Sequence, residues 1–275
     1  MPTFRLTIAY DGNDFLGWQR QPGKRTVQGE LETTFARVTR QSVKCVASGR
    51  TDAGVHALGQ VVGVTVDTWL RGEALVKALN CEGPEDIMVF DATVVHDTFH
   101  AIREATRKRY RYIIENGQVR DVFARNHLWH VFRKLDIDAM RRAAQGLVGT
   151  HDFKSYQTTG SMRMTTVRTV YEISVERVQY DLTERIVIEV EADGFLYNMV
   201  RSIVGTLVDV GKGTRSESNP VEMLSHRCRT KTGMTAPAQG LYLLKVWYDD
   251  VHPHADNPDA EEEESPDVAT EVAAE

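Results

Sequence analysis

Alternating hydrophobic and polar residues predict the first strands of this chain. Residues 3–10 place four large side chains on one side, the period-two pattern of a half-buried strand: Phe4, Leu6, Ile8 and Tyr10. The pattern changes after Thr26, a residue type that caps helices, and apolar residues then recur at helical spacing. Strands are also predicted at 43–48, 61–66 and 87–95, and a helix at 69–80. The order β-α-β-β-α-β is that of a ferredoxin-like unit.

The second part of the chain repeats this order. Its apolar periodicities predict a strand at 107–116, a helix at 137–148, strands at 166–177 and 185–192, a helix at 196–210 and a strand at 240–248. Two such units predict an α+β fold of two ferredoxin-like halves related by a pseudo-two-fold axis, with helices on one face of each sheet. We expect an N-terminal half at 1–105, a C-terminal half at 106–248 and a tail at 249–275, with loops at 117–130 and 154–165.

A glycine-rich loop between two strands of the first half carries the most distinctive residues. It reads Ser48-Gly49-Arg50-Thr51-Asp52-Ala53-Gly54-Val55-His56-Ala57. Loops held by strands often carry function, and glycine permits close backbone approaches. Asp52 stands between the glycines, and the cation of Arg50 two residues away favours an ionised carboxylate that can act as a nucleophile. An ordinary aspartate in a glycine turn fits this spacing equally well.

Two regular elements of the second half also carry charged residues. The strand at 107–116 alternates basic residues with apolar or aromatic ones, which places them on opposite faces: Arg107, Arg109 and Arg111 against Tyr110, Tyr112 and Ile114. The helix at 196–210 is apolar around most of its circumference yet contains Arg201, and a buried arginine requires a carboxylate partner. Asp193 and Asp209 are candidate partners close by in sequence.

The charge of the chain is divided between a body and a tail. The 275 residues carry a formal net charge of −6, which is unusual for a protein that binds nucleic acid. Residues 249–275 hold eleven acids and no Lys or Arg, so 28 of the 39 acids face all 33 bases in residues 1–248, a net charge of +5. A low-complexity acidic segment buries too little apolar surface to offset its ordering entropy, so we expect the tail to be disordered.

Composition places the chain among ordinary globular proteins, with 41% hydrophobic and 26% charged residues. No run approaches the ~18 apolar residues of a membrane span, and the first residues lack the layout of a signal peptide. The cysteines are odd in number and far apart, which disfavours disulfides and zinc and favours a reducing cytoplasm: Cys45, Cys81 and Cys228. The chain has no P-loop and no dinucleotide fingerprint, so we expect no cofactor.

The glycine-rich loop resembles the signature of the TruA family of tRNA pseudouridine synthases. Other segments between about residues 4 and 248 fit the family in the same order: Tyr10-Asp11-Gly12 with Phe15 and Gly17-Trp18-Gln19, Phe99-His100-Ala101, Arg109-Tyr110-Arg111-Tyr112, His151-Asp152-Phe153, Phe195-Leu196-Tyr197-Asn198-Met199-Val200-Arg201, and Gly240-Leu241-Tyr242-Leu243. The long loop motif is far more specific than a lone glycine pattern. The family's reaction breaks the C1′–N1 bond of uridine, rotates the uracil and rejoins it through C5, without a cofactor.

The resemblance implies a role for each candidate residue. Asp52 would attack C1′ of the ribose or C6 of the uracil, or abstract the 2′ proton, and Arg201 would be its ion-pair partner. The target uridine must flip out of its stack, and Tyr110 is similar to the family tyrosine that stacks on the flipped base. Arg50 and Arg109 would hold phosphates or occupy the vacated stack.

The resemblance also implies the substrate and the assembly. The targets would be uridines 38, 39 and 40 in the anticodon arm of tRNA, bound by a homodimer with no metal and no membrane. The two sheets would join into one long, mostly antiparallel sheet with the active cleft between the halves. The basic and polar residues of the loop at 154–165, among them Lys154, Ser155 and Arg163, separately predict a flap that faces RNA. The family usually has arginine directly after Phe99-His100-Ala101, whereas this chain has Ile102 and then Arg103, so that arginine's role is not carried over.

Other interpretations stay open. His96 and His100 have a metal-ligand spacing, although no carboxylate-rich partner helix is predicted. His56 and His151 are each either a general base or a structural histidine. Two ferredoxin-like units also build non-catalytic RNA-binding proteins, but there the aromatic strand carries glycines that this chain lacks. A glycosidase or nucleoside hydrolase normally needs a second carboxylate, and none lies near Asp52 in sequence.

Overall fold

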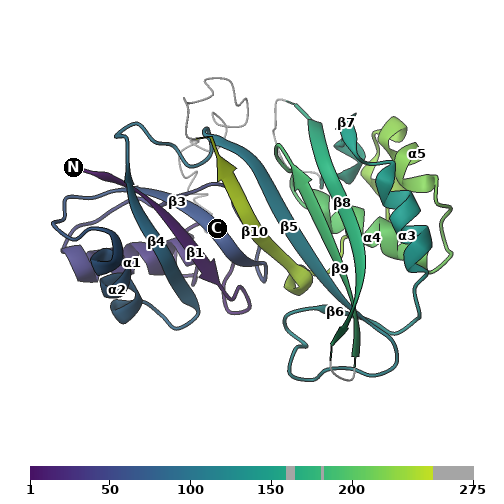
Figure 1. Ribbon diagram of the computed structural model, residues 1–275, viewed down its shortest axis with the longest axis horizontal. Coiled ribbons are helices and arrows are strands. Elements are labelled where there is room, and N and C mark those ends of the chain that lie inside the picture. Colours follow the sequence, from purple (N-terminus) through teal and green to yellow (C-terminus); the bar gives the residue numbers. More distant parts are fainter. Residues whose placement is uncertain (159–164, 181–182, 250–275) are drawn as a thin grey trace, which may run out of the picture.

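The computed structural model describes residues 1–158, 165–180 and 183–249, which form a ten-stranded mixed sheet with α-helices at both ends (Figure 1). Nearly all of the predicted tail and half of the predicted loop at 154–165, residues 159–164, lie outside the described residues. Among the residues described, no helix has the length and apolar content to cross a membrane.

The first half has the predicted ferredoxin-like order. Its elements are β1 (Thr3–Tyr10), α1 (Val27–Thr39), β2 (Val46–Ala47), β3 (His56–Thr65), α2 (Gly72–Glu82) and β4 (Ile87–Val95). In space the strands lie in the order β4-β1-β3, and β2 pairs with β3. Helix α1 begins where Thr26 predicts, because the threonine hydroxyl accepts the backbone N–H of Gly29 at 3.3 Å.

The second half repeats that order with three additions. Its elements are β5 (Ala105–Asn116), β6 (Trp129–Val131), α3 (Ile137–Gln145), β7 (Gly149–Asp152), β8 (Val167–Tyr180), β9 (Thr183–Ala192), α4 (Met199–Gly211), α5 (Asn219–His226) and β10 (Leu241–Tyr248). The spatial order β10-β5-β9-β8 matches that of β4-β1-β3-β2, so the two halves are built alike. The additions are β6, β7 and α5, which the sequence analysis did not predict.

A short parallel seam joins the halves into one sheet. Strand β10 pairs with β3 in parallel at Tyr242–His56 and Leu243–Ala57, and its other edge pairs antiparallel with β5. The other strand pairs that make up this sheet are antiparallel, apart from β5 with β6. The predicted α+β fold with one long, mostly antiparallel sheet is therefore confirmed. The seam lies at the first residues of β3, which directly follow the glycine-rich loop.

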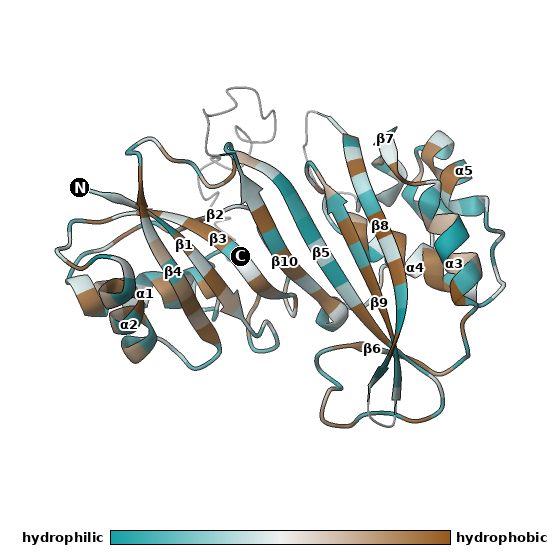
Figure 2. Cartoon of the chain, in the orientation of Figure 1, coloured by the Kyte–Doolittle hydropathy of each residue, from teal (hydrophilic) through white to brown (hydrophobic). Residues whose placement is uncertain are grey.

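The core lies between the helices and one face of the sheet. Figure 2 shows hydrophobic and hydrophilic residues alternating along the central strands, as expected when only one face is covered. On β5, Tyr112 and Ile114 are fully buried with α4 residues such as Ile203 and Leu207 in the same core. The arginines of β5 point to the opposite face, which confirms the predicted division of this strand.

Two strand predictions need correction at the glycine-rich loop. The strand expected at 43–48 is only the two residues of β2, and the strand expected at 61–66 begins five residues earlier, at His56. Most of β3 is buried, including the polar Gln60, so its sequence lacks the alternation that marks a half-exposed strand. The loop that presents Asp52 is therefore shorter on its C-terminal side than expected.

Candidate active site

Asp52 and Arg201 form an ion pair between the two halves. Asp52 lies in the loop before β3, Arg201 lies in the first turn of α4, and Nη1 of Arg201 is 3.2 Å from Oδ2 of Asp52. Arg201 is held from two other sides, because Nε donates to the carbonyl of Ala236 and Nη1 to Oδ1 of Asn198, both at 2.7 Å. The partner implied by the resemblance is present.

The two alternative partners of Arg201 are engaged elsewhere. Asp193 accepts the backbone N–H of Thr169, and Asp209 pairs with Arg215 at 3.3 Å. Both carboxylates therefore serve the local structure of the second half, and only the fold itself brings Asp52 to Arg201.

Burial and Arg201 act in opposite directions on the carboxylate of Asp52. Burial raises the pKa of Asp52, and the charge and hydrogen bond of Arg201 oppose that increase. The side chain is still 33% exposed, against 17% for Arg201, so a substrate has access to the carboxylate. An ionised carboxylate that has lost part of its hydration is a stronger base and nucleophile than one in water, while the arginine keeps it oriented.

A buried polar network fixes the glycine-rich loop to strands β1 and β3. Gln60 on β3 accepts the hydroxyl of Ser48 at 2.8 Å and donates to the carbonyl of Gly49 at 2.9 Å. Tyr10 on β1 shares a hydrogen bond of 2.7 Å with the hydroxyl of Thr51, directly before Asp52. Both ends of the segment before the carboxylate are thus fixed to rigid strands.

The segment after β1 packs tightly on the same loop. The backbone N–H of Trp18 donates to the carbonyl of Thr51 at 2.9 Å. Gly17 has φ +84°, and a Cβ there would lie 2.7 Å from that carbonyl oxygen, so only glycine fits. The segment that contains the buried Trp18 is therefore fixed to the glycine-rich loop through its backbone.

Lys108 ties the second half to the loop. It lies on β5, and its Nζ donates to the carbonyl of Ser48 at 2.5 Å. Sequence reasoning missed Lys108 because it stands among the arginines of that strand, yet strand alternation places it on the same face as Tyr110. It is a second charged link between the halves, besides Arg201.

Tyr110 lies on the face of β5 that carries the site. The residue is 9% exposed, and its ring meets the ring of Phe195 edge to face, with centroids 4.9 Å apart. Phe195 stands just before α4, and the neighbouring Tyr112 donates its hydroxyl to the carbonyl of Pro237 at 2.7 Å. The position is compatible with stacking on a base, and that role stays a prediction.

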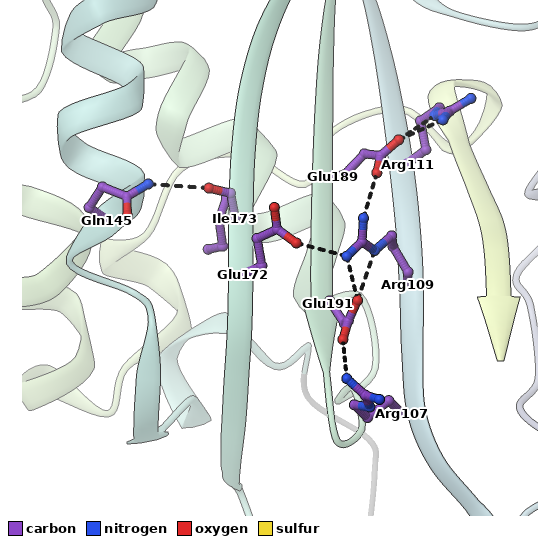
Figure 3. Close-up of polar contacts among 8 residues, drawn as sticks. All are labelled: Arg107, Arg109, Arg111, Gln145, Glu172, Ile173, Glu189 and Glu191. Carbon is purple, nitrogen blue, oxygen red and sulfur yellow. Dashed lines mark hydrogen bonds and ion pairs between the residues drawn. The ribbon is translucent and has the colours of Figure 1, made fainter. Parts of the chain in front are cut away.

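Arg109 points away from this face. Figure 3 shows its guanidinium among three glutamates of β8 and β9, with contacts of 2.7 Å to Glu172, 3.3 Å to Glu189 and 2.9 Å to Glu191. Arg107 and Arg111 pair with the same glutamates. The structure does not bring Arg109 to Asp52, because adjacent strand residues face opposite ways. Its predicted contact with RNA is untested and gains nothing from this geometry.

Two further expectations concern residues beside the site. Arg50 is exposed on the loop, two residues before Asp52, where a phosphate has access to it. Ile102, which replaces the usual family arginine, is 5% exposed and belongs to the buried apolar residues. The position thus has a packing role in this chain, and Arg103 is the nearest basic residue after it.

Asp11, His56 and His127 form a cluster at the C-terminal end of the glycine-rich loop, where β3 begins. Nδ1 of His56 accepts the backbone N–H of Gly12 at 3.0 Å and lies 3.1 Å from Asp11, whose other oxygen is 2.9 Å from His127. His56 also stacks on Tyr242, with centroids 4.7 Å apart. Burial lowers the pKa of His56. His56 is 1% exposed and its Nδ1 is occupied by the N–H of Gly12, which supports the structural interpretation over a general base.

The same cluster is a geometric candidate for a metal, which sequence reasoning missed. The ligand atoms of Asp11, His56 and His127 lie within 4.8 Å of one another. However, Nδ1 of His56 already accepts a backbone N–H, and both imidazoles contact the Asp11 carboxylate. These contacts account for the cluster as a clamp between the segment after β1, β3 and the loop before β6.

Comparison with known proteins supplies the family. The model of the tRNA pseudouridine synthase family matches residues 6–103 and 143–249. A protein of Thermoanaerobacter sp. (strain X514) named tRNA pseudouridine synthase A is 44% identical over 248 residues, covering 90% of this chain and 100% of the relative. A protein of the same name from Acetivibrio thermocellus is 42% identical over 249 residues, again covering 90% of this chain and 100% of the relative.

The chain belongs to the tRNA pseudouridine synthase family. It is therefore an isomerase that converts uridine to pseudouridine in tRNA. The alternative of a non-catalytic RNA-binding protein is not favoured, because the carboxylate loop and its arginine partner are both in place.

Proposed function

We propose that this enzyme forms pseudouridine at positions 38, 39 and 40 of the tRNA anticodon arm, with Asp52 as the catalytic carboxylate. The observation that carries the proposal is the Asp52–Arg201 pair at the junction of the halves. The loop motif and the similarity to proteins named tRNA pseudouridine synthase A support the choice of substrate.

The reaction needs one ionised carboxylate beside the sugar–base junction. Asp52 attacks C1′ or C6, or removes the 2′ proton, and each route ends with uracil rejoined through C5 and the carboxylate regenerated. Arg201 keeps Asp52 ionised and oriented through the step, since its positive charge opposes the rise in pKa that burial causes. No atom of the substrate is lost, so the balanced product is an isomer.

Tyr110 and Arg50 would receive the flipped nucleotide. Extruding a base costs about a few kcal/mol of stacking, and an aromatic surface at the new position recovers part of it. Tyr110 lies on the site face of β5, packed against Phe195, so its ring is held in place before RNA binds. Arg50 is exposed on the catalytic loop, where it can contact the phosphates of the flipped nucleotide.

We also propose that the enzyme acts as a homodimer in the cytoplasm. The family resemblance motivates the dimer, and the reduced cysteines expected from the sequence fit a reducing compartment. Sedimentation of the purified chain tests the first statement, and a single species at the monomer mass would contradict it.

The decisive assay mixes the purified chain with a tRNA transcript that carries uridine at 38, 39 and 40. We expect pseudouridine at these positions and no free uracil. Release of uracil would instead indicate a hydrolase, and pseudouridine confined to another arm of the tRNA would contradict the proposed targets. Mapping tRNA from a strain that lacks the gene provides the matching test in the cell.

A further inference from the structure

A basic hollow lies at the end of α4 away from the catalytic site. It has a volume of about 690 Å³ and is bounded by the segment before α3, the start of α3, and the end of α4 with the turn that follows. Four cationic side chains line it: Arg133, Lys134, Lys212 and Arg215. The hollow is open to solvent, so a large ligand has access to it.

The two acidic residues that line this hollow, Asp136 and Glu217, already have hydrogen-bond partners. The carboxylate of Asp136 caps α3 by accepting the backbone N–H of Ala139 at 2.9 Å. Glu217 makes two hydrogen bonds of 2.7 Å with Arg142, which lies outside the lining. Arg215 is the only lining cation with a carboxylate partner, Asp209, among the residues that the structure describes.

Three cations therefore remain without a carboxylate partner in the described part of the chain: Arg133, Lys134 and Lys212. Lys212 follows the C-terminus of α4, where the helix dipole favours a cation. Arg133 and Lys134 instead precede the N-terminus of α3, where the helix dipole disfavours positive charge. An anion in the hollow would offset the unfavourable position of Arg133 and Lys134 at the N-terminus of α3.

The hollow is within reach of an RNA bound at Asp52. Arg201 lies in the first turn of α4 and Lys212 directly follows its last residue, so the helix separates them by roughly 16 Å at 1.5 Å per residue. A tRNA molecule is much longer than this distance, so one RNA can contact both Asp52 and the hollow.

We propose that the hollow formed by Arg133, Lys134 and Lys212 binds the phosphate backbone of the tRNA substrate at a distance from the target uridine. The proposal rests on the proposed function for the identity of the RNA. Such contacts read no sequence, and they position the RNA in a register that suits neighbouring targets in one arm.

The test compares a triple variant in the hollow with a control variant that has the same change in charge. The triple variant carries Arg133→Gln, Lys134→Gln and Lys212→Gln. A double variant with only the first two changes is also measured, because replacing the half-buried Lys212 could disturb folding. The control carries Arg40→Gln, Lys44→Gln and Lys77→Gln, on the far side of the first half. The dissociation constant of a full tRNA transcript is measured for each from about 50 to 200 mM salt.

We expect the triple variant in the hollow to bind tRNA at least tenfold more weakly than wild type at low salt. Its plot of log Kd against log salt should be shallower by about 2 to 3, since each phosphate contact contributes about 0.9. The variant with two changes should show about two-thirds of that effect, and the control less than one unit. Equal slopes for the hollow and control variants would overturn the proposal.

A second arm separates RNA from a small anion. If 10 mM inorganic phosphate raises the melting temperature of the wild type but not of the triple variant, while both bind tRNA equally, the hollow is a site for small phosphates and the RNA assignment is wrong. The wild type forms pseudouridine in the same preparations if the proposed function holds. Failure of that function and failure of this inference are therefore distinct results.

Discussion

Arg201 and Asp52 are 149 residues apart in sequence, yet Nη1 of the arginine lies 3.2 Å from Oδ2 of the aspartate. One residue comes from the loop before β3 and the other from the first turn of α4, so the site exists only when the two halves are docked. Lys108 repeats this relationship by donating from β5 to the carbonyl of Ser48. The candidate site and the assembly of the fold thus depend on the same contacts.

A double-mutant cycle measures how strongly the pair is coupled. Arg201→Leu should lower the free energy of unfolding, because it leaves the Asp52 carboxylate without its cation in a largely buried position. Asp52→Asn combined with Arg201→Leu should be more stable than the sum of the single changes implies, by about 1 kcal/mol, since both side chains keep some exposure to solvent. Urea unfolding of the four proteins gives the coupling, and additivity within about 0.5 kcal/mol would show that the pair does not form.

The pH dependence of the rate tests the environment of Asp52. The reactive form is the carboxylate, and burial raises its pKa, so activity should fall with decreasing pH earlier than for an ordinary aspartate. Arg201→Gln removes the charge that opposes this increase, so the acid midpoint of kcat/KM should move to higher pH. A midpoint that stays in place would mean that Arg201 does not act on Asp52.

The same shift predicts how stability depends on pH. The folded pKa of Asp52 lies above the unfolded value, so the folded state binds the extra proton between the two, and ionising Asp52 costs stability as pH rises through this window. Relative to wild type, Asp52→Asn should therefore gain stability as pH rises from the acid range to neutrality. Urea unfolding at a series of pH values measures this difference, and a difference that does not change with pH would contradict the raised pKa.

Gln60 should matter for activity although it touches no substrate. Gln60→Leu removes the partner of the Ser48 hydroxyl and of the Gly49 carbonyl in a buried place, which costs about 1–3 kcal/mol. We expect kcat to fall while the affinity for tRNA stays within about threefold, because the loop loses its position and the phosphate contacts remain. Gln41→Leu, in a partly exposed position of the same half, is the matched control for stability. Unchanged kcat in Gln60→Leu would show that the network does not position Asp52.

The histidine clamp predicts a second, opposite dependence on pH. Burial lowers the pKa of His56, with Asp11 opposing this effect and His127 adding to it. The unfolded chain then binds more protons, so stability should decline as pH falls through about 6.5, the ordinary value for histidine. Unfolding at pH 5.5 and 7.5 checks this in wild type and in His56→Asn, whose smaller difference would identify the group. An equal difference in both proteins would exclude His56.

The residue pattern predicted the order of elements, and the family resemblance implied the Asp52–Arg201 pair. Contacts that form only when the two halves dock were not predicted. Strong apolar periodicity located β1, β4 and α1. The prediction for β3 was too short, because a strand buried along most of its length does not alternate hydrophobic and polar residues. The apolar helix around Arg201 predicted that the arginine has a carboxylate partner, but only the tertiary structure excludes Asp193 and Asp209 as that partner. Asn198, one turn before Arg201, had no local signal for its part in holding the guanidinium.

The central claim is that Asp52 performs the isomerisation and that tRNA binding does not depend on it. The most direct measurement incubates wild type and Asp52→Asn with the same tRNA transcript, maps pseudouridine at positions 38, 39 and 40, and determines both dissociation constants. The account predicts complete conversion by wild type, none by the variant, and affinities within about tenfold, because phosphate contacts supply most of the binding. Pseudouridine formed by Asp52→Asn at more than a few per cent of the wild-type rate would contradict the account.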